Sequence, residues 1–421
     1  MRFATLQAWL DWQAAFHPKA IDLGLERVRA VAARLDLLHP QAYVITVGGT
    51  NGKGSSVALL ETALVLSGQR VVAYSSPHLD AYNERIRRNL IPADDTAIIA
   101  AFAAIDAARG DISLSYFEFG TLAAIWLARE FNADCLVLEV GLGGRLDAVN
   151  LLDAEIALVT SIGLDHTDWL GPDLDSIGRE KAGIARPGKP LVVAQRRAPA
   201  GLLETARALG ATLVEVGVDY DFWRDGTSWG WSRSRQVEAA LPLPALPGAH
   251  QVQNAAGVMT VLALLPPGLR PEPRHWRQAL AAVRLAGRFE QVRTAAHTVI
   301  FDVAHNPDSA RALAATLHAY PFEGRTVALF GVMRDKEVEV MFEALGPYVD
   351  EWLLVQPEVD RAMGVDELAR RLRPVLPDAS VTRAGTTTLA WQLFVARCGH
   401  GDRLLVTGSF YTVAEARRIL L

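Results

Sequence analysis

The sequence is poor in cysteine and in long apolar runs. Only Cys135 and Cys398 occur among its 421 residues, and their separation lacks the spacing of zinc ligands. A disulfide scaffold is therefore excluded, and a reducing cytoplasm is the expected location. No stretch of about 18 uncharged apolar residues occurs, so we expect no membrane span. Asp11 interrupts the N-terminal segment before an apolar core of signal length develops, which argues against a secretory signal.

Clustered positive charge is also missing. The chain has 42 Lys and Arg residues against 47 Asp and Glu residues, and its formal charge is −5. Without a basic block, a nucleic-acid partner is not expected. The expected partners are small-molecule substrates. The hydrophobic share of 50% excludes disorder as the main state. The length indicates two or three domains.

Short β-branched runs alternate with longer stretches of helical periodicity in the first half of the chain. The predicted strands are Tyr43–Val47, Val71–Tyr74, Leu136–Val140, Ile156–Val159 and Leu191–Val193. The predicted helices include Ser55–Leu66, Phe117–Arg129 and Asp173–Ala182. Apolar strands that alternate with helices predict a mostly parallel α/β sheet covered on both faces.

The pattern changes after this series. Tyr220–Pro247 carries three tryptophans and ends in a proline-rich run, which predicts an antiparallel hairpin insertion leading into a loop. A helix is expected to begin near Gln251. A second α/β series follows, with predicted strands Val299–Phe301, Val327–Phe330, Trp352–Val355 and Arg403–Val406. We therefore predict a P-loop-type domain at 1–287, a linker at 288–296 and a smaller Rossmann-like α/β domain at 297–421.

The strongest local motif is Val47–Ser55, which lies between a predicted strand and a predicted helix. Its glycines let successive backbone N–H groups curl around an anion, and Lys53 supplies a mobile cation for the β- and γ-phosphates. It departs from the Walker A pattern, because Gly54 follows Lys53 and Val47 occupies the position of the first glycine. The alternative is a plain glycine turn with an exposed lysine.

Polar residues follow several predicted strands, where open α/β sheets bind their ligands. They include the Ser75–Leu79 segment, Glu139 and the Thr160–Asp168 segment. Glu139 lies inside an apolar strand, so it is either neutralised by a partner or bound to Mg²⁺. Histidine is an unusual Mg²⁺ ligand, and the residue pattern alone favours a structural, hydrogen-bonded role for His166.

Three further residues have two interpretations each. Lys181 alone indicates a solvated helix lysine. In the second series, Asp302 and His305 end a strand and open a helix, so they either face a cleft or cap the helix.

Taken together, these motifs resemble the folylpolyglutamate synthase family of the Mur-ligase superfamily over nearly the whole chain. The resemblance rests on seven segments in order: Gly49–Ser55, Ser75–Leu79, Glu139–Arg145, Leu164–His166, Glu180–Ile184, Gly287–Glu290 and Asp302–Pro307. Ile21–Val28, Arg109–Gly120 and Asp165–Pro172 are similar to the bacterial branch that acts on both dihydropteroate and folates.

The resemblance implies specific roles around ATP and magnesium. It assigns the nucleotide to Thr50, Asn51, Gly52, Lys53, Asn254, Arg288 and Asp302. It assigns one Mg²⁺ to Ser76 and Glu139 and a second or shared one to His166, against the structural interpretation of that histidine. It also implies that Lys181 is carbamylated to N6-carboxylysine and helps to hold Mg²⁺. Lys53, His166, Lys181 and His305 are its catalytic candidates, with His305 near the glutamate site. The role of His250 stays open.

The family also implies a pterin pocket and a reaction. The implied dihydropteroate contacts are Asp22, Leu23, Gly24, Leu25, Ser115, Tyr116, Phe117, Glu118, Leu146, Asp147 and Ala148. The implied reaction uses ATP to activate a carboxylate as an acyl phosphate and joins it to L-glutamate, forming dihydrofolate from 7,8-dihydropteroate and extending tetrahydrofolates. A monomer is expected.

Three alternatives stay open. A folate-only extender would lack the activity on dihydropteroate. A Mur-type ligase of a nucleotide-linked precursor would need a third, N-terminal domain, and only about 40 residues precede the phosphate loop. A P-loop switch protein would show no ATP turnover that depends on an amino acid.

Overall fold

The computed structural model describes residues 2–17, 22–294, 297–399 and 401–421. The chain divides into two compact units. Unit 1 comprises Met1–Gly163, Thr167–Ala245 and Val252–Val283, and unit 2 comprises Leu164–His166, Leu246–Gln251 and Arg284–Leu421. Ile21, which begins one of the segments shared with the family, lies outside the described residues.

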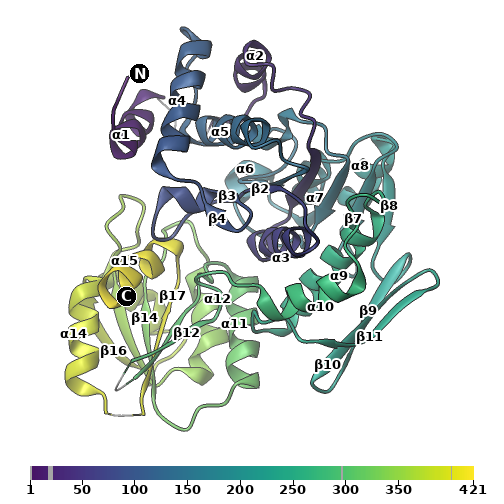
Figure 1. Ribbon diagram of the computed structural model, residues 1–421. Helices are drawn as coiled ribbons and strands as arrows, with labels where there is room; N and C mark the ends of the chain where they lie inside the picture. The colour runs from purple at the N-terminus through teal and green to yellow at the C-terminus, as the bar shows by residue number, and fades with distance from the viewer. Residues whose placement is uncertain (1, 18–21, 295–296, 400) are drawn as a thin grey trace. The chain divides into compact units, whose positions relative to one another are not determined.

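Unit 1 is built on a large, mostly parallel sheet. Its strands are β1 (Tyr43–Gly48), β2 (Val71–Tyr74), β3 (Ile86–Arg88), β4 (Ile91–Pro92), β5 (Cys135–Glu139), β6 (Ile156–Val159), β7 (Pro190–Val193) and β8 (Thr212–Glu215). Their order is β4-β3-β2-β5-β1-β6-β7-β8 (Figure 1). The parallel strands are β2, β5, β1, β6, β7 and β8. At one edge, β3 pairs with β2 and β4 pairs with β3, both in antiparallel orientation. The predicted α/β class is confirmed.

Helices cover both faces of this sheet, as fully buried parallel strands require. One face packs against α1 (Leu6–Phe16), α2 (Glu26–Arg34), α4 (Asp95–Arg109), α5 (Tyr116–Glu130), α7 (Leu174–Ala182) and α8 (Ala200–Ala208). The other packs against α3 (Lys53–Leu66), α9 (Ala249–Leu264) and α10 (Pro273–Ala282). Three short elements, η1 (Tyr82–Arg85), η2 (Ala148–Leu151) and α6 (Thr167–Leu170), lie in the connections. Figure 1 shows α5 and α3 on opposite sides of β2.

The predicted hairpin insertion is a three-stranded antiparallel sheet, one strand more than a hairpin, and the expected loop follows it at 243–248. Its strands are β9 (Tyr220–Asp225), β10 (Ser228–Arg233) and β11 (Gln236–Pro242), with β10 in the centre. Trp229 and Trp231 alternate along β10 and are fully buried. Trp231 Nε1 donates to Thr260 Oγ1 of α9 at 3.0 Å, which ties the sheet to that helix.

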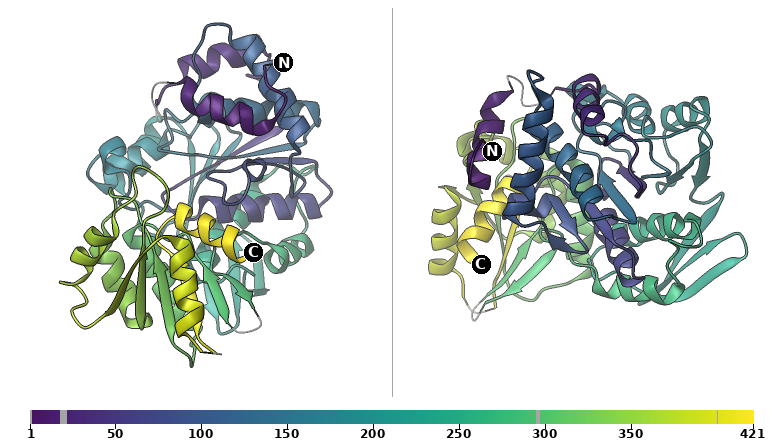
Figure 2. Two further views of the ribbon diagram at one scale, coloured as in Figure 1. Left: turned by 90° about the vertical axis from the view of Figure 1, so that its left-hand side faces the viewer. Right: turned by 45° about the horizontal axis from the view of Figure 1, so that its top comes forward.

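Unit 2 is a second doubly wound sheet. Its strands are β12 (Glu290–Arg293), β13 (Thr298–Phe301), β14 (Thr326–Phe330), β15 (Glu351–Val355), β16 (Ser380–Gly385) and β17 (Arg403–Thr407), in the order β12-β13-β17-β14-β15-β16. Only β12 is antiparallel to its neighbour. One face packs against α11 (Pro307–Ala319), α12 (Val338–Leu345) and α13 (Val365–Leu372), with η3 (Gly346–Tyr348) after α12. The helices α14 (Thr387–Arg397) and α15 (Phe410–Leu420) lie together on the other, as Figure 2 shows in yellow.

Two edge strands of unit 2, β12 and β16, were not predicted. The β12 strand falls inside the segment 288–296 that we expected as a linker, and it pairs with β13 from Glu290 to Arg293. The division into domains at 1–287 and 297–421 stays a prediction. Among the described residues, no helix combines the length and the apolar character that crossing a membrane requires.

Candidate active site

The phosphate-loop candidate joins β1 to α3 at the carboxyl edge of the first sheet. Gly49 and Gly52 have φ values of +139° and +88°. A Cβ at Gly49 would lie 2.0 Å from Thr160 Oγ1, and one at Gly52 would lie 2.5 Å from Asn254 Oδ1. Both positions therefore require glycine. The loop leads into the amino end of the 14-residue helix α3, whose free N–H groups favour an anion.

The residues after β6 hold this loop in shape. Thr50 N donates to Ser161 O at 2.6 Å, and Gly163 N donates to Thr50 Oγ1 at 3.0 Å. Asn51 N donates to Ser161 Oγ at 3.1 Å, and Thr160 Oγ1 donates to Asn51 O at 2.7 Å. The neighbouring strand thus fixes the backbone of Thr50 and Asn51, two of the predicted nucleotide contacts. Asn254, a third, lies beside Gly52.

Two lysines converge on the loop. Lys53 Nζ donates to Gly49 O at 3.0 Å and to Thr50 O at 3.1 Å. Lys181 Nζ, from α7, donates to the same Gly49 oxygen at 3.0 Å, so the two nitrogens lie at most 6.0 Å apart. Lys181 is only 4% exposed, which excludes the solvated-lysine interpretation. Two ammonium groups this close repel each other, so the site favours an anion.

The structure brings together two of the three predicted magnesium ligands. Glu139 ends β5 and is 4% exposed, and its Oε2 accepts a hydrogen bond from Ser76 N at 3.3 Å. A carboxylate and a hydroxyl at the ends of adjacent strands are oxygen donors that suit Mg²⁺. In the described part of the chain, no group of three His, Cys, Asp or Glu side chains is arranged so that it could hold a metal ion. A metal here would draw its other ligands from phosphate or water. His166, the third predicted ligand, belongs to unit 2.

The predicted pterin residues of the first two segments meet around Arg27. Arg27 Nη1 lies 2.7 Å from Asp22 Oδ2, and its Nη2 donates to Glu118 Oε1 at 3.2 Å. Glu118 is buried, and its other oxygen accepts from Ser115 N at 2.7 Å, which closes the capping box of α5. Arg27 therefore joins the Asp22–Leu25 and Ser115–Glu118 segments.

Gly141 lies beside both Phe117 and Asp147 of the third pterin segment. A Cβ at Gly141 would lie 2.7 Å from the Phe117 ring and 3.4 Å from Asp147 Oδ2. The Asp147 carboxylate accepts from Gly141 N and Leu142 N at 2.9 Å, and from Val149 N at 3.0 Å. Burial raises the pKa of Asp147 to about 6, although these three hydrogen bonds and the charge of Lys53 oppose the shift.

The raised pKa of Asp147 predicts a pH-dependent contribution to stability. The contribution is complete below the ordinary carboxyl pKa of 3.8 and is lost as pH rises through about 6. It amounts to about 3 kcal/mol of unfolding free energy. We expect urea unfolding of the wild type and Asp147→Asn to differ more at pH 4 than at pH 7.5. The exposed Asp111→Asn is the control, and a difference that is constant with pH would contradict the prediction.

Unit 2 brings its predicted site residues to the carboxyl end of β13. Asp302 Oδ2 accepts from Phe289 N and its Oδ1 from Ala304 N, each at 2.9 Å. Burial raises the pKa of Asp302, and the nearby Arg288 charge opposes this. The Arg288 guanidinium lies 5.2 Å from the Phe410 ring centroid. Asp302 does not cap α11, because the N-cap of that helix is Asn306, and the ligand role of Asp302 stays a prediction.

A charged cluster in unit 2 surrounds Asp165. Lys336 Nζ lies 2.6 Å from Asp165 Oδ1, His305 Nε2 lies 3.4 Å from Oδ2, and Asn306 Nδ2 donates to Oδ2 at 3.0 Å. Burial alone would raise the pKa of Asp165, but the hydrogen bond and charge of His305 and the charge of Lys336 hold it well below its usual range. The cluster keeps an ionised carboxylate beside His166.

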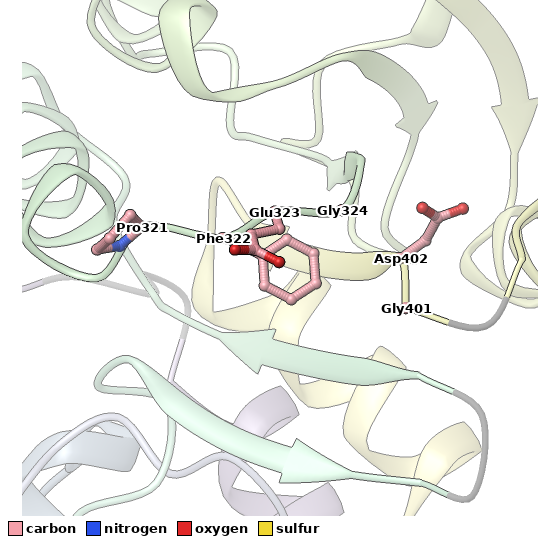
Figure 3. A pocket seen from close by; sticks show the side chains of 6 residues that line it. All are labelled: Pro321, Phe322, Glu323, Gly324, Gly401 and Asp402. Atoms are coloured by element: carbon pink, nitrogen blue, oxygen red, sulfur yellow. The ribbon is translucent and has the colours of Figure 1, made fainter.

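A surface hollow in unit 2 lies away from these residues. Its lining is Pro321, Phe322, Glu323, Gly324, Gly401 and Asp402 (Figure 3). These residues precede β14 and β17, whereas Asp302, His305 and Lys336 follow the carboxyl ends of β13 and β14. Since β13, β17 and β14 are parallel, the hollow is at the opposite edge of the sheet.

The sequence analysis missed the residues that position the candidates. Thr160 and Ser161 belong to the Thr160–Asp168 segment, but His166 was the only residue of that segment predicted to belong to the site. No local sequence pattern indicated Arg27 or Lys336, because their partners Glu118 and Asp165 are 91 and 171 residues away.

Comparison with known proteins gives one match to a domain in the second half of the chain and matches to relatives and solved structures over nearly its whole length. Residues 287–410 match the Mur ligase, glutamate ligase domain. The chain is 43% identical to "Dihydrofolate synthase/folylpolyglutamate synthase" from Escherichia coli strain K12 over 99% of this chain and 95% of that protein.

Solved structures extend the similarity to the fold. E. coli FolC in complex with DHPP and ADP matches with a TM-score of 0.92 and 41% identity, covering 99% of this chain and 98% of that one. A bifunctional folylpolyglutamate synthase/dihydrofolate synthase with Mn, AMPPNP and L-glutamate bound matches with a TM-score of 0.89, 41% identity and the same coverage.

Proposed function

Because the chain belongs to the dihydrofolate synthase/folylpolyglutamate synthase family of Mur ligases, we infer that it is an ATP-dependent ligase of folate biosynthesis. It joins L-glutamate to 7,8-dihydropteroate, which forms dihydrofolate, and adds further glutamates to tetrahydrofolates. The observation that carries this function is the Gly49–Lys53 loop, which is shaped for phosphate and faced by the ammonium groups of Lys53 and Lys181.

Thr50, Asn51, Gly52 and Lys53 are our proposed contacts to the ATP phosphates, and Asn254, Arg288 and Asp302 are the proposed contacts to the rest of the nucleotide. The support for the loop is its rigid backbone and its two cations. A fixed array of donors stabilises the charge that develops on the phosphoryl oxygens without having to reorganise during transfer.

Ser76 and Glu139 are the proposed holders of one Mg²⁺, with His166 as the ligand of a second or shared ion. When bound, Mg²⁺ offsets negative charge on the transferring phosphoryl group. The buried Glu139 carboxylate beside the Ser76 amide supports the first assignment. Of the similar structures, one contains Mn with AMPPNP and L-glutamate.

Carbamylation of Lys181 fits the crowding of charge at Gly49. Nζ first loses a proton, and the neutral amine then adds CO₂ and releases a second proton, which leaves an anionic carbamate. The repulsion between Lys181 and Lys53 thereby becomes an attraction. The burial of Lys181 supports this proposal, because a buried cation that faces a like charge is costly.

For the acceptor acid we propose the pocket formed by Asp22–Leu25, Ser115–Glu118 and Leu146–Ala148. The supporting contacts are those of Arg27 with Asp22 and Glu118, and of Phe117 with Gly141. In unit 2, His305 is proposed to lie near the glutamate, positioned by Asp165.

The order of chemical steps follows from the reactivity of a carboxylate. Its leaving group would be oxide, so it is first phosphorylated by ATP to an acyl phosphate. Lys53 is our proposed cation for offsetting charge on the γ-phosphoryl oxygens. The amine of glutamate then attacks the acyl carbon, and the tetrahedral adduct collapses with loss of phosphate. Exclusion of water protects the acyl phosphate from hydrolysis.

ADP release tests this function and separates its alternatives. The enzyme is incubated with ATP and Mg²⁺, with dihydropteroate or with tetrahydrofolate, each with and without L-glutamate. We expect glutamate-dependent ADP release with both acids. Glutamate-dependent ADP release with tetrahydrofolate but not with dihydropteroate would indicate a folate-only extender. The absence of ADP release with both acids would contradict the folate assignment.

Three further proposals concern the state of the protein. Two metal sites, a monomer and a cytoplasmic location follow from the family resemblance and the cysteine content. Mass determination in solution tests the monomer, and metal titration tests the number of sites.

A further inference from the structure

Arg87 lies on β3, opposite Ala73 of β2, and forms a largely buried ion pair in which its side chain is 14% exposed and that of Glu61 is 1% exposed. Its Nε donates to Glu61 Oε2 at 2.7 Å. Glu61 belongs to α3, the helix that begins with the phosphate loop, and it is fully buried. Its second oxygen accepts from Leu90 N at 2.8 Å. The carboxylate therefore fixes the edge strands against the helix that carries Lys53.

The same guanidinium reaches the turn that carries Ser76. Arg87 Nη1 donates to Ser75 Oγ at 2.8 Å and to Glu84 O at 3.0 Å. Ser75 N in turn donates to Arg85 O at 2.8 Å. One side chain thus links the phosphate-loop helix to the residue directly before Ser76.

Stability alone does not account for this arrangement. A buried ion pair usually adds little to folding, because desolvation of both charges offsets their attraction. The Nη2 atom of Arg87 is buried and has no hydrogen-bond partner among the described residues, which is a further cost. Apolar side chains of similar size would fill the same space.

We propose that Arg87 and Glu61 are positioning residues that hold Ser76 in register with the phosphate loop, so that metal and ATP phosphates are bound together. The proposal rests on the function proposed above. It gives the ion pair a role toward the metal, as the partners that orient direct ligands commonly have. Neither side chain is proposed to touch substrate.

The test replaces the pair by apolar side chains in the full-length chain. In Glu61→Leu/Arg87→Met we expect thermal unfolding without metal to stay near that of the wild type. Mn²⁺ binding in the presence of AMPPNP, measured from the paramagnetic resonance of free Mn²⁺, is expected to weaken by about 10- to 100-fold. AMPPNP binding without metal is expected to change little.

Arg70→Met is the matched control. Arg70 Nη2 lies 2.8 Å from Asp134 Oδ1 at the amino ends of β2 and β5, the same two strands that lead to Ser76 and Glu139 at their other ends. This variant is expected to bind Mn²⁺ as the wild type does.

The outcomes are distinct. Wild-type Mn²⁺ affinity in a folded double variant would overturn the proposal. If the double variant does not fold, Arg87→Lys decides: a single ammonium cannot reach Glu61, Ser75 and Glu84 in a fork, so weakened Mn²⁺ binding in a folded protein supports the proposal and unchanged binding overturns it. If the wild type itself binds neither Mn²⁺ nor AMPPNP, the proposed function fails first.

Discussion

Replacing Lys53 by alanine is expected to lower ATP turnover by about 10²- to 10³-fold while the chain still folds. Among the described residues, Lys53 Nζ donates hydrogen bonds only to the backbone carbonyls of Gly49 and Thr50. Its ammonium lies at the turn where we propose that the phosphoryl charge develops, so its loss is expected to remove stabilisation of the transition state. ADP release at saturating ATP measures the effect, and circular dichroism reports the fold.

The control for Lys53→Ala is Lys189→Ala, because Lys189 is exposed and directly precedes β7, at the amino edge of the sheet whose carboxyl edge carries the loop. It is expected to turn over like the wild type. An unfolded Lys53→Ala variant, or one with normal turnover, would contradict the role given to Lys53.

The interior of both sheets was predictable from the sequence. Val71–Tyr74 and Ile156–Val159 are strands with the predicted bounds, because every side chain of a central parallel strand is buried and must be apolar. In edge strands the requirement for apolar side chains is weaker. In β16 most side chains are partly or fully exposed, so Ser380–Gly385 reads as loop. The third strand of the insertion, β11, is exposed in the same way.

In the candidate site too, features that depend on neighbouring residues were predictable from the sequence, whereas features that depend on distant residues were not. The phosphate loop was predictable because nine consecutive residues carry it. The burial of Lys181 was not, since it depends on Gly49, which is 132 residues away. Its helix, with charged neighbours Arg179 and Glu180, predicts a solvated side chain, and only the family resemblance gave Lys181 a role. The ion pair of Arg87 with Glu61 likewise joins residues that no motif connects.

A second large effect is expected from a single methyl group at Gly52. Gly52 and Gly68 flank α3 and have almost the same backbone conformation, with φ values of +88° and +89°. A Cβ at Gly52 would lie 2.5 Å from Asn254 Oδ1, whereas one at Gly68 has nothing within 4 Å. Alanine should therefore cause similar backbone strain at both positions, about 1–2 kcal/mol.

Only Gly52→Ala should also disturb the nucleotide site. The methyl group must displace the Asn254 amide or open the loop, and a shift of about 1 Å is enough to lower kcat/KM for ATP by roughly 100-fold. Denaturant unfolding is expected to show a loss of stability in Gly52→Ala at least as large as that in Gly68→Ala, whereas only Gly52→Ala is expected to lose ADP release. Equal ATP use by the two variants would mean that the loop tolerates a side chain, and the close approach of the backbone to phosphate would lose its support.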